Sequence, residues 1–181
     1  MGMPVQHYYS AADLLDLPED GNKYEVVHGE LLVTPAPRKL HQRLVGRLSF
    51  EVGGYLRAHP VGEAYPGGDV CSGDDNLVIP DLLVVDLVSA RSGSWREMDT
   101  PLLVVEVLSQ SSSRTDRFTK RRLYQEIGVP CYWLVDPDAK VVEIWTPDAA
   151  FPVVEHQTVE WHPAGAAEPL RIALDALFRD P

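Results

Sequence analysis

Long apolar runs are missing from this sequence. None approaches the roughly 20 residues that a membrane span requires, although 45% of the 181 residues are hydrophobic. The segment Met1–Tyr9 also lacks the basic and then apolar layout of a signal peptide. We therefore expect a cytoplasmic protein with no membrane partner.

The sequence contains only two cysteines, and its net charge is negative rather than positive. Cys71 and Cys131 match no metal-ligand or redox spacing, so buried free thiols are favoured over a disulfide. The formal charge of −11 excludes a wholly basic protein that coats nucleic acid. Local basic surfaces stay open, because the positive side chains are clustered. The clusters are Arg38, Lys39, His41, Arg43 and Arg47, and Arg114, Arg117, Lys120, Arg121 and Arg122.

Several signatures of enzymes are absent. The sequence has no Gly-x-Ser-x-Gly nucleophile turn, no zinc-ligand pair and no glycine-rich phosphate loop, which argues against a small-molecule hydrolase. The polar segment 72–76 lacks the spacing and the terminal acid of a calcium loop. No repeat or linker interrupts the chain. We therefore expect a single domain over residues 1–181, with its core at about 22–147.

Two apolar runs, 78–86 and 101–109, are the most informative segments, and each has the pattern of a buried strand. Each also contains an acid, Asp81 in the first run and Glu106 in the second. An ionised carboxylate buried without a partner costs several kcal/mol. Neighbouring strands lie about 4.8 Å apart, so two carboxylates on one face can share a cation. Hydrogen-bonded structural acids are the alternative.

Periodicity and turn residues predict the remaining elements. A hairpin with strands 24–27 and 30–34 turns at His28-Gly29, because Gly tolerates positive φ. Apolar residues at every fourth position predict a helix over 40–56. Further strands are expected at 62–65, 69–72, 131–135, 141–145 and 153–161, and further helices at 8–18, 114–127 and 174–178.

Two side chains on the predicted helices are candidates to join the acids. His41 borders the apolar stripe of its helix and is placed to point toward a site beneath it, with a structural hydrogen-bonding role as the alternative. Lys120 shares one helix face with the apolar residues 3, 4 and 7 positions later. This spacing favours an inward Lys120; the alternative is an exposed side chain paired with Asp116.

Together these residues suit a metal-dependent phosphodiesterase. Asp81, Glu106 and the carbonyl of Val107 offer the hard oxygen ligands that Mg²⁺ or Mn²⁺ prefers. Such a metal polarises a phosphate and acidifies a bound water. Lys120 would orient that water or stabilise charge on the phosphoryl oxygens. The basic clusters would hold a polyanionic backbone.

Several short motifs occur in an order and spacing that are specific when taken together. They are Tyr24-Glu25, Gly29-Glu30-Leu31, His41, Pro80-Asp81, 105–109, Asp116 with Lys120 and Tyr124, and 128–136. Over roughly residues 10–150 the chain thus closely resembles the Uma-type family of bacterial restriction-endonuclease-like proteins. The resemblance implies the α/β (α+β) fold of the PD-(D/E)XK nucleases, a central mixed sheet flanked by helices, here with an N-terminal β-hairpin.

The resemblance also implies roles for the acids. Asp81 matches the PD acid and Glu106 the second acid, so both are expected to bind Mg²⁺. Glu30 is matched to an additional acid near the N-terminus, with Glu25 and Glu51 as competing positions.

One position departs from the superfamily pattern. Two residues after Glu106 the usual lysine is replaced by Leu108, so Lys120 would have to supply the amine from the helix. The leading hypothesis is a Mg²⁺-dependent endonuclease acting on DNA. Its catalytic residues would be Asp81, Glu106, Lys120, Glu30 and His41. The alternative is an inactive nuclease-fold binding or assembly protein, homodimeric through exposed strands or the aromatic C-terminal region, in which the strand acids are structural.

Overall fold

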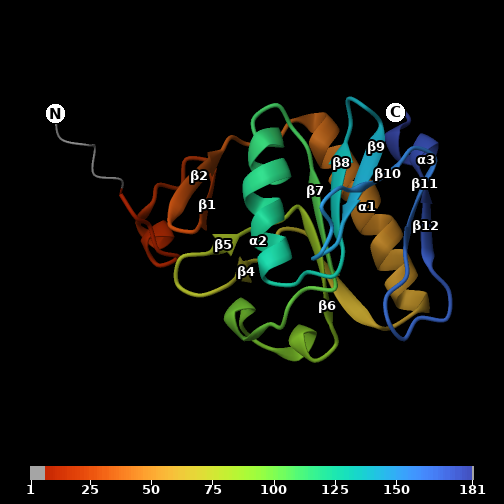
Figure 1. Ribbon diagram of the computed structural model, residues 1–181, viewed down its shortest axis with the longest axis horizontal. Coiled ribbons are helices and arrows are strands. Elements are labelled where there is room, and N and C mark those ends of the chain that lie inside the picture. The colour runs from red at the N-terminus through yellow and green to blue at the C-terminus, as the bar shows by residue number, and fades with distance from the viewer. Residues whose placement is uncertain (1–6, 181) are drawn as a thin grey trace.

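The largest element of the structure, a computed structural model that describes residues 7–180, is a six-stranded sheet (Figure 1). Most of the N-terminal segment tested above for a signal peptide lies outside the described residues. The strand order is β10-β9-β8-β7-β6-β3. The strands are β3 (Gly62–Tyr65), β6 (Leu82–Asp86), β7 (Leu103–Val107), β8 (Tyr132–Asp136), β9 (Val141–Trp145) and β10 (Val153–Glu155). Only β7 and β8 pair in parallel among these neighbours, so the predicted mixed sheet is confirmed within the described chain.

Both faces of β6 and β7 are buried, which explains their nearly continuous apolar sequence. Side chains alternate between the faces of a strand. Leu82 and Val84 accordingly pack into one core cluster, and Leu83 and Val85 pack into a second cluster on the other face. By the same alternation Glu106 lies on the face of the second cluster.

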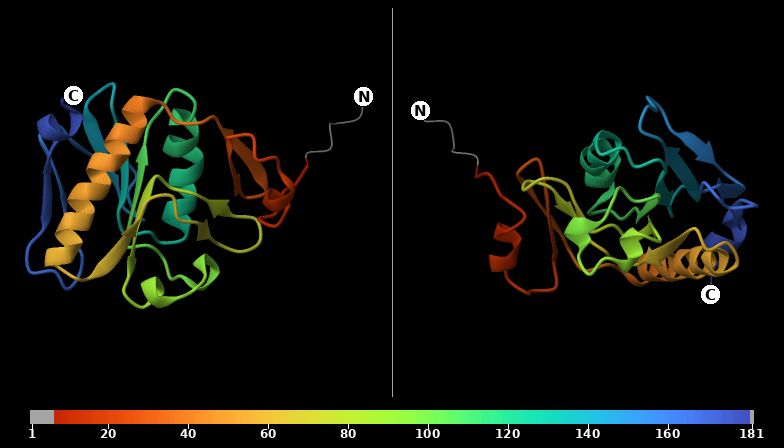
Figure 2. Two further views of the ribbon diagram at one scale, coloured as in Figure 1. Left: turned by 180° about the vertical axis from the view of Figure 1, so that it is seen from behind. Right: turned by 90° about the horizontal axis from the view of Figure 1, so that it is seen from below.

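Helix α1 (Lys39–Ala58) covers the first face of the sheet (Figure 2). Its buried residues Leu44, Leu48, Val52 and Leu56 recur every four positions, which confirms the predicted apolar stripe. C-terminal elements pack into the same cluster. They are β11 (Thr158–Trp161), β12 (Leu170–Ala173) and α3 (Leu174–Phe178).

The opposite face carries the connection between β7 and β8. The helix predicted over 114–127 is present, but most of its first half is a π-helix, Thr115–Lys120, which continues as α2 (Arg121–Glu126). Gly128, at φ +77°, follows its end. π-helical segments are rare in proteins, but those that occur are often found at functional sites. Here it contains two buried charged residues, Asp116 and Lys120.

A smaller sheet has the order β2-β1-β5-β4. Its strands are β1 (Lys23–Val27), β2 (Glu30–Thr34), β4 (Val70–Cys71) and β5 (Leu77–Val78). The turn between β1 and β2 holds His28 at φ 50° and Gly29 at φ 74°. Two positive φ values characterise the tight turns that suit β-hairpins, and the predicted N-terminal hairpin is confirmed.

The apolar run 78–86 is not one strand, contrary to the prediction. The strand β5 ends at Val78 and β6 begins at Leu82, and the two belong to different sheets. Pro80 explains the break, because it has no N–H to donate to a strand ladder. Asp81 therefore lies at the junction of the two sheets.

Two other predictions need correction. The single strand expected over 153–161 divides into β10 and β11, because β10 pairs with β9 whereas β11 pairs with β12. The helix expected over 8–18 is reduced to a 3₁₀ turn, Asp13–Asp16, which buries no residue against the core. The polar connection between β6 and β7 contains two further 3₁₀ turns, Ser89–Arg91 and Trp95–Glu97.

Two expectations from composition concern cysteines and membranes. Cys71 and Cys131 are free thiols, as predicted, although both are only partly buried. Within residues 7–180 no helix has the length and apolar character needed to cross a membrane.

Candidate active site

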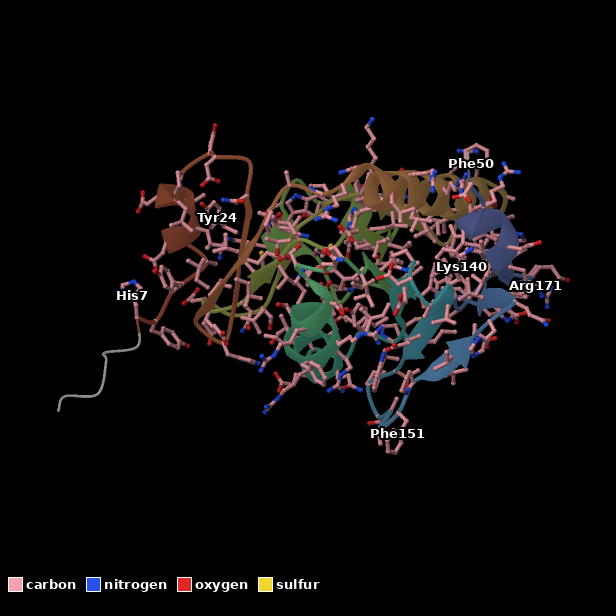
Figure 3. The ribbon with its side chains drawn as sticks, turned by 90° about the horizontal axis from the view of Figure 1, so that it is seen from above. His7, Tyr24, Phe50, Lys140, Phe151 and Arg171 are labelled. Atoms are coloured by element: carbon pink, nitrogen blue, oxygen red, sulfur yellow. The ribbon has the colours of Figure 1, made fainter. Side chains whose placement is uncertain are left out.

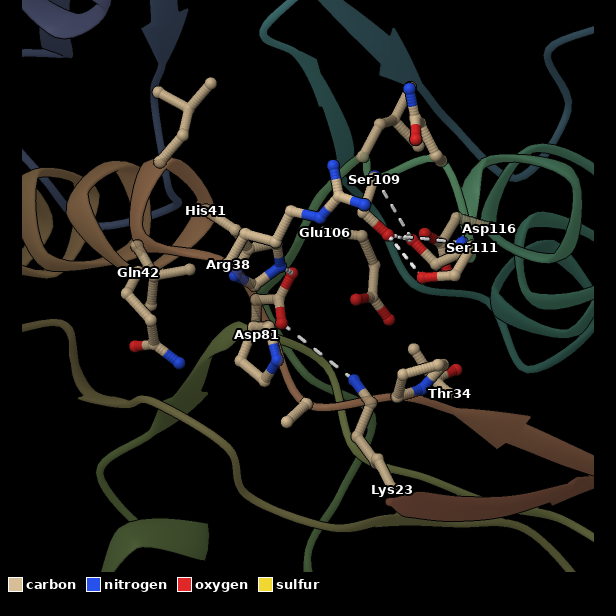
Figure 4. A pocket seen from close by; sticks show the side chains of 18 of the residues that line it. Lys23, Thr34, Arg38, His41, Gln42, Asp81, Glu106, Ser109, Ser111 and Asp116 are labelled. Carbon is tan, nitrogen blue, oxygen red and sulfur yellow. Dashed lines mark hydrogen bonds and ion pairs between the residues drawn. The ribbon is translucent and has the colours of Figure 1, made fainter. Parts of the chain in front are cut away.

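A cavity of about 700 Å³ opens where the two sheets meet (Figure 4). Its wall combines segments that are far apart in the sequence. The charged and imidazole side chains among the lining residues include Lys23, Arg38, His41, Asp81, Glu106 and Asp116. The two strand acids of the sequence analysis thus face one space. Strands β6 and β7 are antiparallel, and Leu82 pairs with Val105. Asp81, one residue before Leu82, therefore lies opposite Glu106, one residue after Val105.

Asp81 is held through one of its two carboxylate oxygens. Its Oδ2 lies 2.9 Å from His41 Nε2 and accepts a hydrogen bond of 2.8 Å from the Val107 N–H. The other oxygen, Oδ1, lies 3.9 Å from Lys23 Nζ. Burial raises the pKa of Asp81, but the hydrogen bond from His41 and the charge of Lys23 outweigh burial and leave the pKa below its ordinary value. An ionised Asp81 only accepts hydrogen bonds, so His41 Nε2 carries the proton.

Glu106 is also held through one oxygen. Its Oε1 accepts hydrogen bonds of 2.9 Å from Lys120 Nζ and 3.2 Å from the Tyr124 hydroxyl. Within the described chain no hydrogen bond reaches Oε2, and Glu106 lines the cavity. Burial raises the pKa of Glu106 to about 8, with Lys120 opposing the rise and Asp116 adding to it.

Lys120 points inward and is the centre of a buried charge cluster. Its Nζ lies 2.8 Å from Glu25 Oε1, 2.9 Å from Glu106 Oε1 and 3.5 Å from Asp116 Oδ1, and its side chain is 2% exposed. Burial lowers the pKa of Lys120, but the three carboxylates raise it well above the ordinary value. An ammonium group has three donors, and three carboxylates surround this one. Lys120 is not among the residues that line the cavity.

Of the three N-terminal acids considered, the structure brings Glu25 to this cluster. Glu25 is fully buried and its Oε1 accepts a hydrogen bond of 2.7 Å from the Ile79 N–H, in addition to contacting Lys120. Glu30 is exposed at the start of β2, and Glu51 is exposed on α1; neither lines the cavity. The structure therefore places Glu25, rather than Glu30, beside Lys120, and the catalytic role expected for Glu30 stays a prediction.

Glu25 and Glu30 provide a matched pair for measuring the cluster. Glu25→Gln is expected to lower the free energy of unfolding by about 1–3 kcal/mol, because a buried amide leaves the Lys120 charge poorly compensated. Glu30→Gln, on an exposed side chain, is expected to leave it nearly unchanged. Urea denaturation followed by tryptophan fluorescence measures both. Equal losses in the two variants would contradict the assignment of Glu25 to the cluster.

Two cavity residues, Lys23 and Asp116, were absent from the predicted catalytic set. Burial raises the pKa of Asp116, with Lys120 opposing the rise. The sequence signals for Asp116 were its spacing of four residues before Lys120 and its place in the family motif with Lys120 and Tyr124, neither of which assigned it to the site. Lys23 carried no signal, since a single lysine before a strand resembles any exposed lysine.

The basic clusters are largely engaged within the protein. Arg117 pairs with Asp136 and Glu143, and the Arg121 guanidinium stacks on Trp145. In the first cluster, Arg47 donates hydrogen bonds of 2.7 Å to the backbone carbonyls of residues 177 and 179. Arg38 lies on the cavity rim and Lys39 and Arg114 are exposed, and the polyanion-binding surface expected from the clusters stays a prediction.

The donor set fits a magnesium-type ion held by few protein ligands. Asp81 Oδ1 and Glu106 Oε2 are hard oxygens on residues that line one cavity, and the four acids Glu25, Asp81, Glu106 and Asp116 outnumber the ammonium groups of Lys23 and Lys120. Among residues 7–180 no group of three or more His, Cys, Asp or Glu side chains is placed to hold a metal. Mg²⁺ tolerates this, because it keeps several waters and binds one or two carboxylates together with substrate phosphates. Val107 contributes its N–H to Asp81, and the role predicted for its carbonyl stays a prediction.

Comparison with known proteins supports the same fold. A crystal structure from Anabaena variabilis, described as "a putative nuclease belonging to DUF820", aligns with a TM-score of 0.79 and 21% sequence identity, covering 94% of this chain and 97% of that one. Among proteins whose functions have been curated, none matches this chain. The profile of the Uma2 family, described as "Putative restriction endonuclease", matches residues 11–175. The fold and the resemblance in the sequence are therefore confirmed, and this chain belongs to the Uma2 family.

Proposed function

We propose that this protein is a metal-dependent nuclease that hydrolyses phosphodiester bonds of DNA, with Mg²⁺ or Mn²⁺ held by Asp81 and Glu106. One observation carries the proposal. Each acid has one oxygen fixed by hydrogen bonds, while its second oxygen is left for the shared cavity. A fully enclosed oxygen without a partner, such as Glu25 Oε2, cannot reach a ligand, whereas the second oxygens of Asp81 and Glu106 belong to residues that line the cavity and are not among these enclosed atoms. The descriptions of the family and of the Anabaena protein agree with this class of activity.

The metal, when bound, would polarise the phosphate and lower the pKa of a bound water. The residues of this chain do the positioning. His41 and the Val107 N–H fix Asp81, while Lys120 and Tyr124 fix Glu106. In the reaction one water is consumed: its oxygen bonds to phosphorus, the bond from phosphorus to a sugar oxygen breaks, and a water proton ends on that sugar oxygen. Preorganised donors are effective because negative charge develops on the phosphoryl oxygens during this step.

The proposal is tested with purified protein, supercoiled plasmid and single-stranded DNA. Cleavage is expected with Mn²⁺ or Mg²⁺ and is expected to stop on addition of EDTA, since the two carboxylates alone cannot polarise the phosphate. Calorimetric titration with Mn²⁺ in the absence of DNA is expected to detect binding. Absence of both cleavage and metal binding would overturn the proposal.

Exposed apolar residues favour a second candidate function, assembly without catalysis. The edge strand β10 has Val153 59% exposed and Val154 41% exposed, and Phe151 projects from the molecule beside it (Figure 3). An open edge strand is a template for pairing with another chain, including a second copy. This candidate is favoured over the nuclease if no DNA is cut and metal titration gives no heat.

A further inference from the structure

We propose that Lys23, rather than Lys120, is the amine that contacts the reacting phosphate. This inference rests on the proposed nuclease function and names a catalytic residue for it. The superfamily lysine position holds Leu108, whose side chain is 5% exposed and packs in an apolar cluster. The amine must therefore come from elsewhere in the chain. The sequence contains four lysines, Lys23, Lys39, Lys120 and Lys140, and Lys23 is the one among them that lines the cavity.

Lys120 is poorly placed for contact with a substrate. Its side chain is 2% exposed, and its Nζ is enclosed by Glu25 at 2.8 Å, Glu106 at 2.9 Å and Asp116 at 3.5 Å. Withdrawing it from these partners would leave three buried carboxylates without a cation, which costs several kcal/mol. Its role in the structure is to hold Glu106 and Glu25 in position.

Lys23 has the opposite properties. Its side chain is 28% exposed, and its Nζ donates one hydrogen bond, of 2.9 Å, to the Ile79 carbonyl. The nearest carboxylate oxygens, Glu25 Oε1 at 4.0 Å and Asp81 Oδ1 at 3.9 Å, are too distant for hydrogen bonds. Two donors of the ammonium group therefore stay available to a ligand in the cavity. Figure 4 shows Lys23 reaching from β1 toward Asp81.

The position next to Asp81 suits an electrostatic role. An anionic phosphate that approaches Asp81 meets the positive charge of Lys23 in a partly desolvated cavity, where such contacts are stronger than in water. The bond to the Ile79 carbonyl fixes the amine at the junction of the sheets. Leu108 cannot donate a hydrogen bond to the phosphoryl oxygens. Lys23, on strand β1, thereby supplies the donor that stabilises the charge developing on them.

Kinetics of two substitutions test the assignment. Lys23→Gln is expected to lower the single-turnover rate of plasmid cleavage by about 10²- to 10³-fold, which is the usual effect of removing one such donor. Lys23→Arg, which keeps the charge, is expected to recover part of that loss. The exposed Lys140→Gln is the matched control and is expected to cleave at the rate of the unmodified protein. The assignment fails if the unmodified protein cleaves and Lys23→Gln cleaves equally fast.

Lysine labelling tests the contact independently of activity. Acylation with an N-hydroxysuccinimide ester, read by mass spectrometry, is expected to modify Lys23 and Lys140 but not Lys120 in the free protein. A short single-stranded oligodeoxynucleotide with Ca²⁺ is expected to protect Lys23 and to leave Lys140 labelling unchanged. Lack of protection at Lys23 overturns the inference even in a protein that cuts DNA. Protection without any cleavage would support the phosphate contact while the nuclease function itself fails.

Discussion

Lys120→Met is expected to destabilise the protein by about 3–5 kcal/mol, the usual cost of removing one partner from a buried charge cluster. Methionine keeps the unbranched apolar stem and lacks the terminal amine, so the loss mainly reports charge rather than volume. Three carboxylates lie within 3.5 Å of the Lys120 amine, and all three belong to buried residues. Without the cation they must be buried as unpaired charges or take up protons.

The pH dependence of this loss distinguishes charge from packing. Burial already raises the pKa values of Glu106 and Asp116 in the folded protein, and loss of Lys120 raises them further. A carboxyl group with a raised folded pKa binds its proton more tightly in the folded state, so stability declines as pH rises from its ordinary pKa toward the folded value. For Glu106 this window runs from 4.5 to about 8. The deficit of Lys120→Met is therefore expected to be larger at pH 8 than at pH 5.

Urea denaturation in metal-free buffer, followed by fluorescence of the buried Trp133, measures this effect. The exposed Lys140→Met serves as the control and is expected to match the unmodified protein at both pH values. A deficit independent of pH would mean that Lys120 contributes packing rather than compensation of the acids.

The strands and helices followed from local patterns because local forces dominate there. Leu and Val residues run almost unbroken through β6 and β7. This pattern is typical of strands that are buried on both faces. The four-residue spacing along α1 likewise specified its buried face. The break at Pro80 was also visible in the sequence, since proline cannot donate to a ladder. What periodicity could not reveal is that β5 and β6 join different sheets, because pairing partners are set by contacts distant in the sequence.

The candidate site was only partly predictable for the same reason. Asp81 and Glu106 stood out as acids within apolar runs, and Glu25, with Val26 and Val27 after it, carried the same signal. The resemblance favoured Glu30 instead, and local sequence offers no means of seeing that Glu25 faces a lysine 95 positions later. The position of the Lys23 amine depends on its hydrogen bond to the Ile79 carbonyl, 56 residues away. No local sequence pattern predicts this contact.

Asp81→Asn is expected to reduce DNA cleavage by about 10³-fold, because metal-assisted charge stabilisation is worth several kcal/mol and each 1.36 kcal/mol is tenfold in rate. The substitution is nearly isosteric. Its amide oxygen can still accept the hydrogen bonds from His41 and the Val107 N–H that now hold Oδ2, which places the amide NH₂ toward Lys23. The fold is therefore retained, whereas the negative oxygen offered to a metal is lost.

Single-turnover cleavage of supercoiled plasmid with Mn²⁺ measures the loss, and calorimetric titration measures Mn²⁺ affinity in the same preparation. Asp138→Asn is the matched control, since Asp138 lines the same cavity but is exposed and far in sequence from the strand acids. Loss of both cleavage and Mn²⁺ affinity in Asp81→Asn alone would locate the metal at Asp81. Unchanged cleavage in both variants would trace the activity to a contaminating nuclease, because a trace enzyme is unaffected by substitutions in this chain. Loss of cleavage with Mn²⁺ affinity unchanged would instead make Asp81 a positioning residue and move the metal toward Glu106 and Asp116.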